Sequence, residues 1–166
     1  LEPMGAIGDA GWYNMRATVE YLAPDAEPVS VSTVGRLDEA TGTVIAGAGV
    51  IQMSDGSTST WDCAYDIGGP VMDCVITGRK GAIRVENFLR QDVDHSASYR
   101  LVRSGPGAMD EVRRIASEQL DGARMFDTFA AIAAESSPRD AWADATLRTQ
   151  LLLDASWAAL SASNTR

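Results

Sequence analysis

The chain has 166 residues, of which 45% are hydrophobic and 22% charged, a composition typical of one globular domain and too apolar for general disorder. The formal net charge is −9, and the 14 lysines and arginines are scattered along the sequence, which argues against binding to nucleic acid. No apolar run reaches the roughly 18 residues that a membrane-spanning helix needs, and no signal-peptide pattern is visible. We therefore expect a cytoplasmic protein that binds neither nucleic acid nor membrane.

The first predicted element is a helix from about Gly8 to Leu22, with Pro24 as a stop. Asp9 is interpreted as its N-cap or as an acid in its first turn. Apolar residues recur three and four positions apart, which places them on one helical face. These residues are Trp12, Met15, Val19 and Leu22.

The middle of the chain has the alternating period of strands. Segments 27–37, 42–53 and 57–67 read as strands, and Asp55-Gly56 between the last two is a strong hairpin signal. Glycines 47 and 49 indicate either a bulge, a close approach of another backbone, or simply a weakened strand. Segments 70–78 and 82–89 flank a second tight turn, and 96–103 could form one more strand.

Helical spacing returns after the loop at residues 104–107. One helix, with Met125, Phe126 and Phe129 on its apolar face, is expected to end before Pro138, and a final helix covers about 139–161. The order helix, strands, helices predicts an α+β fold with a largely antiparallel open sheet of five or six strands and helices packed on one face. We expect a single domain over residues 1–166.

Histidine and cysteine content limits the kinds of active site. His95 is the only histidine, so a His-rich metal site is excluded and a Ser-His-Asp triad would depend on this residue alone. Its position in a polar stretch is most simply that of a loop residue. Cys63 and Cys74 lie in segments that read as neighbouring strands, so a disulfide is one alternative, but free thiols are expected. The sequence therefore predicts no metal site.

The glycine-rich stretch GAIGDAGWY, residues 5–13, is not a dinucleotide-binding fingerprint. That motif has the form G-x-G-x-x-G after a strand and within a βαβ unit, whereas no strand is predicted here and the glycine spacing differs. No Walker-type sequence ending in Gly-Lys-Ser or Gly-Lys-Thr occurs either. The chain thus has no recognisable site for NAD, FAD or ATP, and no cofactor-binding residue is assigned.

Asp9 and Tyr13 are the residues of this stretch that could carry chemistry. Residues four apart lie on the same helical face, so the carboxylate and the phenol could both point at one small molecule. A carboxylate accepts hydrogen bonds from hydroxyl groups, and a phenol can donate to a carbonyl or relay a proton. The alternative is that Asp9 caps the helix and Tyr13 packs.

The segment GDAGWYNMRA, residues 8–17, resembles the Asp-x-Gly-x-Tyr motif that opens the C-terminal domain of the Gfo/Idh/MocA oxidoreductases, in their tyrosine branch. The family includes glucose-fructose oxidoreductase and inositol dehydrogenase. Segment 41–66 is similar to the family's paired strands around a hairpin, 74–88 to its edge-strand element, and 126–137 with 144–163 to its closing helices. The likeness spans residues 5–163.

The resemblance implies an NAD(P)-dependent enzyme whose nucleotide-binding Rossmann domain, with its Glu-Lys-Pro motif, is absent from this chain. The only lysine, Lys80, lies in the turn GRKG, where a solvated turn residue is expected. The chain would then be the substrate-binding and oligomerisation domain of a dehydrogenase that acts on a sugar, polyol or related diol. Such a domain would pair with a second copy through its open sheet and would be inactive alone.

The resemblance also implies roles for individual residues. Tyr13 would stand beside the nicotinamide and the substrate carbonyl as acid/base or hydrogen-bond donor, and Asp9 would orient the substrate or the catalytic group. Gly11 would let substrate or cofactor approach the helix. Trp12 is a substrate-wall or core residue, and Arg16 holds an anionic substrate or a surface ion pair.

The predicted strand at 57–67 has two possible roles. Its alternation places Trp61, Cys63 and Tyr65 on one face and Asp62 on the other. Its aromatic residues could line a sugar-stacking surface, or they could serve packing or a dimer contact. The alternative hypothesis for the whole chain is a non-redox, stand-alone binding or dimerisation module of the same fold.

Overall fold

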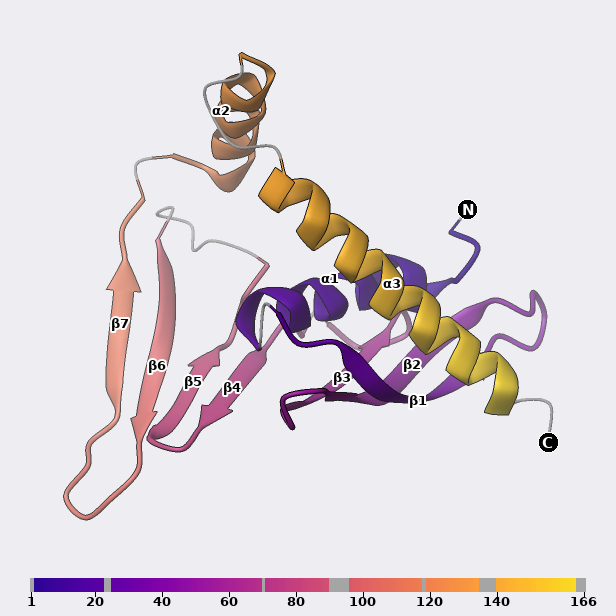
Figure 1. Cartoon of the computed structure of the whole chain (residues 1–166), viewed down its shortest axis with the longest axis horizontal. Helices are drawn as coiled ribbons and strands as arrows, with labels where there is room; N and C mark the ends of the chain where they lie inside the picture. Colours follow the sequence, from indigo (N-terminus) through magenta and orange to yellow (C-terminus); the bar gives the residue numbers. More distant parts are fainter. Residues whose placement is uncertain are drawn as a thin grey trace. The chain divides into compact units, whose positions relative to one another are not determined.

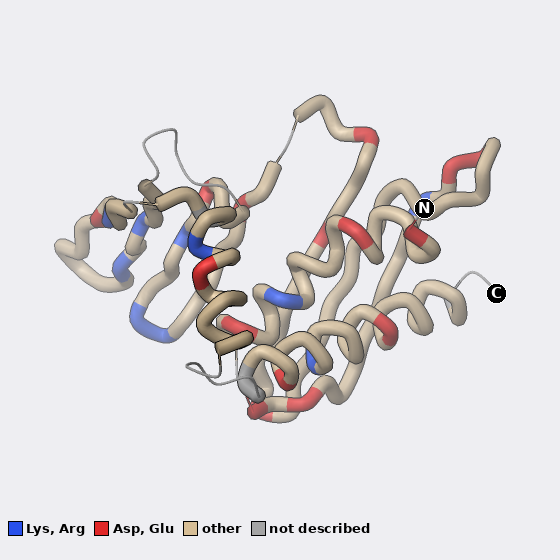
Figure 2. The backbone as a smooth tube through the Cα atoms, turned by 90° about the horizontal axis from the view of Figure 1, so that it is seen from above, with Lys and Arg blue, Asp and Glu red and all other residues tan. Residues whose placement is uncertain are grey.

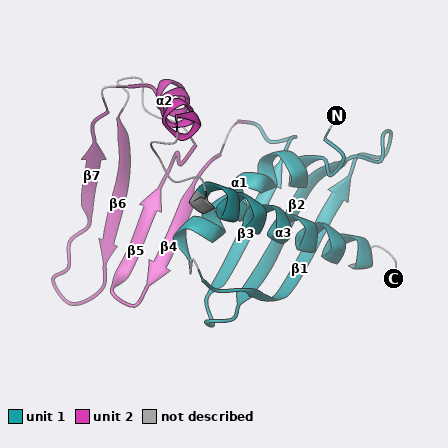
Figure 3. Cartoon of the chain, turned by 45° about the horizontal axis from the view of Figure 1, so that its top comes forward, with its two compact units in different colours: residues 1–68, 140–166 teal, residues 69–139 magenta. Residues whose placement is uncertain are grey.

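The computed structural model describes residues 2–22, 25–69, 71–89, 96–117, 119–134 and 140–163. The chain divides into two compact units, shown in Figure 3. Unit 1 combines residues 1–68 with 140–166, and unit 2 consists of residues 69–139. The predicted loop position of His95 lies outside the described residues.

Unit 1 consists of a three-stranded antiparallel sheet with two helices on one of its faces (Figures 1 and 3). The strands follow one another in the order β1-β2-β3, joined by short connections. The two helices contact each other, and both contact the sheet. The elements are α1 (Ala6–Tyr21), β1 (Pro28–Leu37), β2 (Val44–Met53), β3 (Thr58–Ala64) and α3 (Asp140–Ser163).

The core of unit 1 lies between the sheet and these helices. The apolar face of α1 carries Ile7 and Met15, both fully buried, and the strands contribute alternate residues such as Ile51 and Trp61. Burial of each such side chain contributes about 1.5–3 kcal/mol. The alternation predicted for β3 is confirmed, because Trp61 and Cys63 are buried while Asp62 is exposed.

Gly47 and Gly49 of β2 accommodate their neighbours on the core side of the sheet. A Cβ atom on Gly47 would lie 2.6 Å from Cγ1 of Ile7, and one on Gly49 would lie 2.9 Å from Cε2 of Trp61. The pairing of β2 with both adjacent strands is regular at these positions. Close approach is therefore what these glycines permit, by side chains at Gly47 and by both a side chain and a backbone at Gly49, where a Cβ atom would lie 2.6 Å from the carbonyl oxygen of Ser32. No bulge occurs at either position.

Unit 2 contains a four-stranded antiparallel sheet in the order β4-β5-β6-β7 and one helix. The turn between β4 and β5 uses Gly81 at a φ of 145°, where a Cβ atom would meet the carbonyl oxygen of Val102. The elements are β4 (Cys74–Gly78), β5 (Gly81–Val85), β6 (Ala97–Arg103), β7 (Glu111–Ile115) and α2 (Asp121–Ala133).

The predicted α+β class with open antiparallel sheets is confirmed, and the details differ in two respects. The described residues form seven strands instead of five or six, because β7 is an additional strand, and these strands form two separately hydrogen-bonded sheets. Among the described residues, no helix combines the length and apolar character required to cross a membrane.

Candidate functional site

Helix α1 begins earlier than its sequence pattern indicates. Gly5 precedes it with a φ of 57°, and a Cβ atom on this residue would lie 2.2 Å from the carbonyl oxygen of Val44, so glycine is required there. The helix starts at Ala6, which makes Asp9 an acid of the first turn and not the N-cap. The negative charge of Asp9 is favourable at this end of the helix dipole.

Two polar side chains fix α1 against β3. Nδ2 of Asn14 donates a hydrogen bond of 2.9 Å to the carbonyl oxygen of Asp62. The hydroxyl groups of Thr18 and Ser59 lie 2.8 Å apart and share a second hydrogen bond. Together with the buried face of the helix, these contacts set which residues of α1 face outward.

The exposed carboxylate of Asp9 accepts a hydrogen bond of 3.1 Å from the hydroxyl of Tyr65. Tyr65 follows β3 directly, and its backbone N–H donates to the carbonyl oxygen of Ile45 at 2.9 Å, which ties this tyrosine to the end of the sheet. The structure thus brings together two residues 56 positions apart. Sequence reasoning did not assign Tyr65 to the site with Asp9.

Burial, the hydrogen bond to Asp9 and the negative charge of that carboxylate together raise the pKa of Tyr65 to about 12. A carboxylate can only accept, so the phenol must keep its proton for this bond to persist. Tyr65 therefore acts as a hydrogen-bond donor that holds the Asp9 side chain.

Tyr13 lies on the same helix with 44% of its surface exposed. Its ring contacts that of Trp12 edge-on, with centroids 5.7 Å apart and an interplanar angle of 86°. Within the described ranges, no hydrogen bond engages the Tyr13 hydroxyl, which remains available to a ligand. Asp9 bonds to Tyr65 and not to Tyr13.

The other predicted site residues of α1 have contacts inside the protein. Trp12 is half-buried and packs against the core. Gly11 is buried, and a Cβ atom there would lie 3.6 Å from Sγ of Cys63, so this glycine faces the sheet and not solvent. Arg16 forms a 2.6 Å ion pair with Glu20, and its guanidinium carbon also lies 5.8 Å from the centroid of the Trp142 ring.

The sheet of unit 1 has a second face, opposite its helices, which we call the open face. It carries a shallow hollow with a volume of about 460 Å³. Val34 and Val50 are 64% and 45% exposed there. The alternating residues that line the hollow are Ser32, Val34, Ala48, Val50, Thr60 and Asp62.

The described residues were compared with the requirements of a metal site and of a reactive thiol. Across the described parts of the chain, no three His, Cys, Asp or Glu side chains gather as a metal site requires. Cys63 and Cys74 are both free thiols. Burial raises the pKa of Cys63 to about 11, so its thiol stays protonated and a poor nucleophile at neutral pH.

Comparison with known proteins gives a consistent fold. No protein-family model matches the chain. The structure is similar to KijD10, a 3-ketoreductase from Actinomadura kijaniata that was solved with TDP-benzene and NADP. The TM-score is 0.78 and the sequence identity is 22%, and the match covers 92% of this chain and 46% of KijD10. It is also similar to UDP-N-acetylglucosamine 3-dehydrogenase GnnA from Acidithiobacillus ferrooxidans, with a TM-score of 0.74 and 20% identity over 96% and 48% of the two chains.

A third similar structure is aldose-aldose oxidoreductase from Caulobacter crescentus, with a TM-score of 0.75 and 18% identity over 96% of this chain and 46% of that one. These neighbours are oxidoreductases of the Gfo/Idh/MocA type, so the resemblance found in the sequence is confirmed at the level of the fold. The chain spans about half the length of each.

Proposed function

We propose that this chain is the substrate-binding and oligomerisation part of an NAD(P)-dependent oxidoreductase acting on a sugar, polyol or related diol by hydride transfer. The observation that carries the proposal is the fold match over 92% of the chain with a ketoreductase solved with NADP. Similarity to a sugar-nucleotide dehydrogenase and to an aldose oxidoreductase supports the same class of substrate.

The exposed side of α1 supplies the chemical groups for this role. The Tyr13 hydroxyl can donate a hydrogen bond to a substrate carbonyl or exchange a proton with it. The Asp9 carboxylate, held by Tyr65, has further lone pairs that can accept hydrogen bonds from substrate hydroxyl groups. Arg16 and Gly11 have protein contacts that favour positioning of the helix over direct contact with the substrate.

The described residues do not fit the nucleotide portion of NAD or NADP. Every strand pair named above is antiparallel, and α1 follows a turn, so the parallel strand-helix-strand unit that binds a dinucleotide is not found in these ranges. We propose that a separate Rossmann-type domain holds the nucleotide and that this chain alone is inactive. Its contribution is the wall that binds and orients the substrate.

The open face is proposed to pair with a second copy of the chain. It is free of helices and carries exposed apolar side chains, Val34 and Val50, among polar residues, and apolar patches with a polar rim mark protein interaction sites. Its charged margin, where Arg36 pairs with Asp66, resembles the polar rim of a protein interface.

The proposal is tested in a protein that joins this chain to its nucleotide-binding domain. Tyr13→Phe should lower kcat by about 10²–10⁴-fold with little change in cofactor affinity, since a general acid or base contributes on that scale. Tyr21→Phe is the matched control, because Tyr21 is also exposed on α1, and it should leave turnover unchanged.

Two results would contradict the proposal at different levels. Turnover unaffected by Tyr13→Phe would remove Tyr13 from the mechanism but leave the enzyme class intact. A joined protein that binds neither NAD nor NADP would instead support a non-redox binding module with this fold.

A further inference from the structure

The charges of the chain are divided unequally between its two units. Unit 2 contains ten of the 14 lysines and arginines and ten of the 23 acidic residues, so its net charge is zero. Unit 1 therefore carries the whole net charge of −9. Figure 2 shows basic residues gathered along the strands of unit 2. The basic residues are thus concentrated in one continuous stretch of the chain, residues 69–139.

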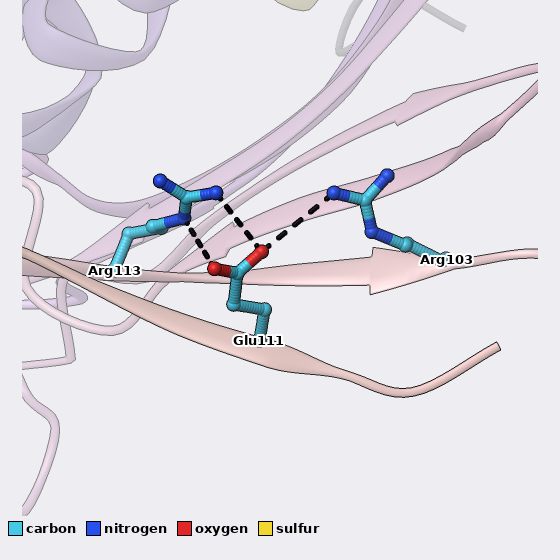
Figure 4. Close-up of polar contacts among 3 residues, drawn as sticks. All are labelled: Arg103, Glu111 and Arg113. Atoms are coloured by element: carbon cyan, nitrogen blue, oxygen red, sulfur yellow. Dashed lines mark hydrogen bonds and ion pairs between the residues drawn. The ribbon is translucent and has the colours of Figure 1, made fainter.

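On one face of the unit 2 sheet, a glutamate of the same sheet pairs with the arginines. Glu111 of β7 accepts two hydrogen bonds from Arg113, with Nε at 2.8 Å and Nη2 at 3.1 Å from its carboxylate oxygens (Figure 4). The same carboxylate pairs with Arg103 of β6 at 3.6 Å. A single anionic group thus bridges two guanidinium groups on neighbouring strands.

The opposite face of this sheet has the arginines without the bridging anion. Arg84 and Arg100 are direct partners in the pairing of β5 with β6, and both are exposed. Val75 pairs with Arg84 and Val112 with Arg100, so one row crosses all four strands. We call this row, Val75, Arg84, Arg100 and Val112, the arginine row.

Neither guanidinium group of the arginine row forms an ion pair or hydrogen bond in the described parts of the chain. Glu86 is exposed just beyond the end of β5, and no ion pair joins it to Arg84. Like charges directly opposite each other on paired strands destabilise a sheet. An external anion between the two groups would remove this repulsion.

A third arginine lies on the same face of the sheet as the row. Arg114 pairs with Ser98 in the register of β7 with β6 and therefore lies on the same face, diagonal to Arg100. Its Nε donates a 2.8 Å hydrogen bond to Oγ of the buried Ser96, which anchors the side chain. The planar donor fork of arginine matches phosphate oxygens in a bidentate geometry, and a phosphate group carries more negative charge than a carboxylate to offset two guanidinium groups.

We propose that the arginine row is a binding site for a phosphate or diphosphate group, held between Arg84 and Arg100 in the way that Glu111 is held between Arg103 and Arg113. Val75 and Val112, which are 49% and 67% exposed, provide apolar contact for an organic part of the ligand at either end. The site is independent of the redox role proposed for α1.

The test measures binding of inorganic phosphate, inorganic pyrophosphate and a nucleoside diphosphate to the 166-residue chain at low salt. Pyrophosphate should bind saturably and shift the Nε–Hε resonances of Arg84 and Arg100 in nitrogen-15 NMR spectra. Arg84→Gln combined with Arg100→Gln should weaken binding at least about tenfold, because charge-assisted hydrogen bonds are lost.

The matched control is Arg103→Gln combined with Arg113→Gln, which removes the same charge from the other face of the same sheet. This variant should bind pyrophosphate within about twofold of the parent chain, since the bridging contacts to Glu111 are not part of the site. Without ligand, the first variant should be at least as stable as the parent, because a repulsion is removed.

The probes also separate the sources of the phosphate. If the nucleoside diphosphate binds more tightly than pyrophosphate, and Val112→Ser abolishes this difference in affinity, the site is assigned to an organic diphosphate. Equal binding would assign it to the phosphate group alone. Absence of saturable binding by all three probes, or equal weakening in both arginine variants, would overturn the proposal.

Discussion

The hydrogen bond between Tyr65 and Asp9 links the outer side of α1 to the end of β3. The raised pKa of Tyr65, about 12, means that the folded chain keeps this proton at pH values where an unfolded tyrosine, near 10, loses it. The stability that this difference supplies is complete below pH 10 and is lost as the pH rises toward 12.

Titration of tyrosine ultraviolet absorbance tests this pair of residues. The difference between the curves of the parent chain and of Tyr65→Phe should show one phenol with a midpoint near 12. Asp9→Asn should move that midpoint down, because the accepting charge is removed. A Tyr65 midpoint near 10 in the parent chain would show that the bond to Asp9 is not maintained in solution.

At the scale of elements, α3 shows how neighbouring residues of one helix have opposite environments. Leu152 is 3% exposed and belongs to the core of unit 1, whereas Leu151 is 54% exposed. Leu152→Ala should lower the free energy of unfolding by about 2–5 kcal/mol, through lost burial and the cavity left behind. Leu151→Ala should change it by less than about 0.5 kcal/mol.

Urea denaturation of both leucine variants measures this difference directly. The two changes delete the same atoms from adjacent positions, so helix propensity and composition cancel in the comparison. If both variants lower the free energy of unfolding equally, Leu151 is covered in solution. If neither variant changes it, α3 does not pack on the sheet as described.

The elements differ in how far their residues predict them. Helix α1 and the hairpin at Asp55-Gly56 were predicted because helical spacing and turn chemistry are local properties. Strand β7 was missed because Glu111–Ile115 contains three charged residues in five and lacks clean alternation. The division of the strands into two sheets was not predicted. It depends on which strands pair with each other, and pairing between distant segments is not encoded in a local sequence pattern.

The candidate site was predicted in the same partial way. Spacing of four residues identified Asp9 and Tyr13 on one helix, and their roles stay predictions. Tyr65 was placed on a strand with Trp61 and Cys63, and that alternation could have directed it toward α1 because the shared face is the one the helix covers. The missing information was which helix would cover that face.

At the scale of the whole molecule, the open face predicts self-association. Val34→Lys combined with Val50→Lys introduces charge into the proposed interface, so this variant should sediment as a smaller species than the parent chain at micromolar concentration. Val71→Lys, at a position 71% exposed outside this face, should leave the sedimentation unchanged. A parent chain that sediments as a monomer at all concentrations would contradict the proposed pairing.

Unit 1 is assembled from two stretches of sequence with all of unit 2 between them. On the ribosome, α1 and its sheet emerge first, but α3, which covers part of the same face, follows only after some seventy further residues have been translated. At the usual rate of synthesis this delay is on the order of several seconds. During that interval, buried residues such as Ile51 lack part of their cover, and a chaperone that binds nascent apolar surface would find its target then.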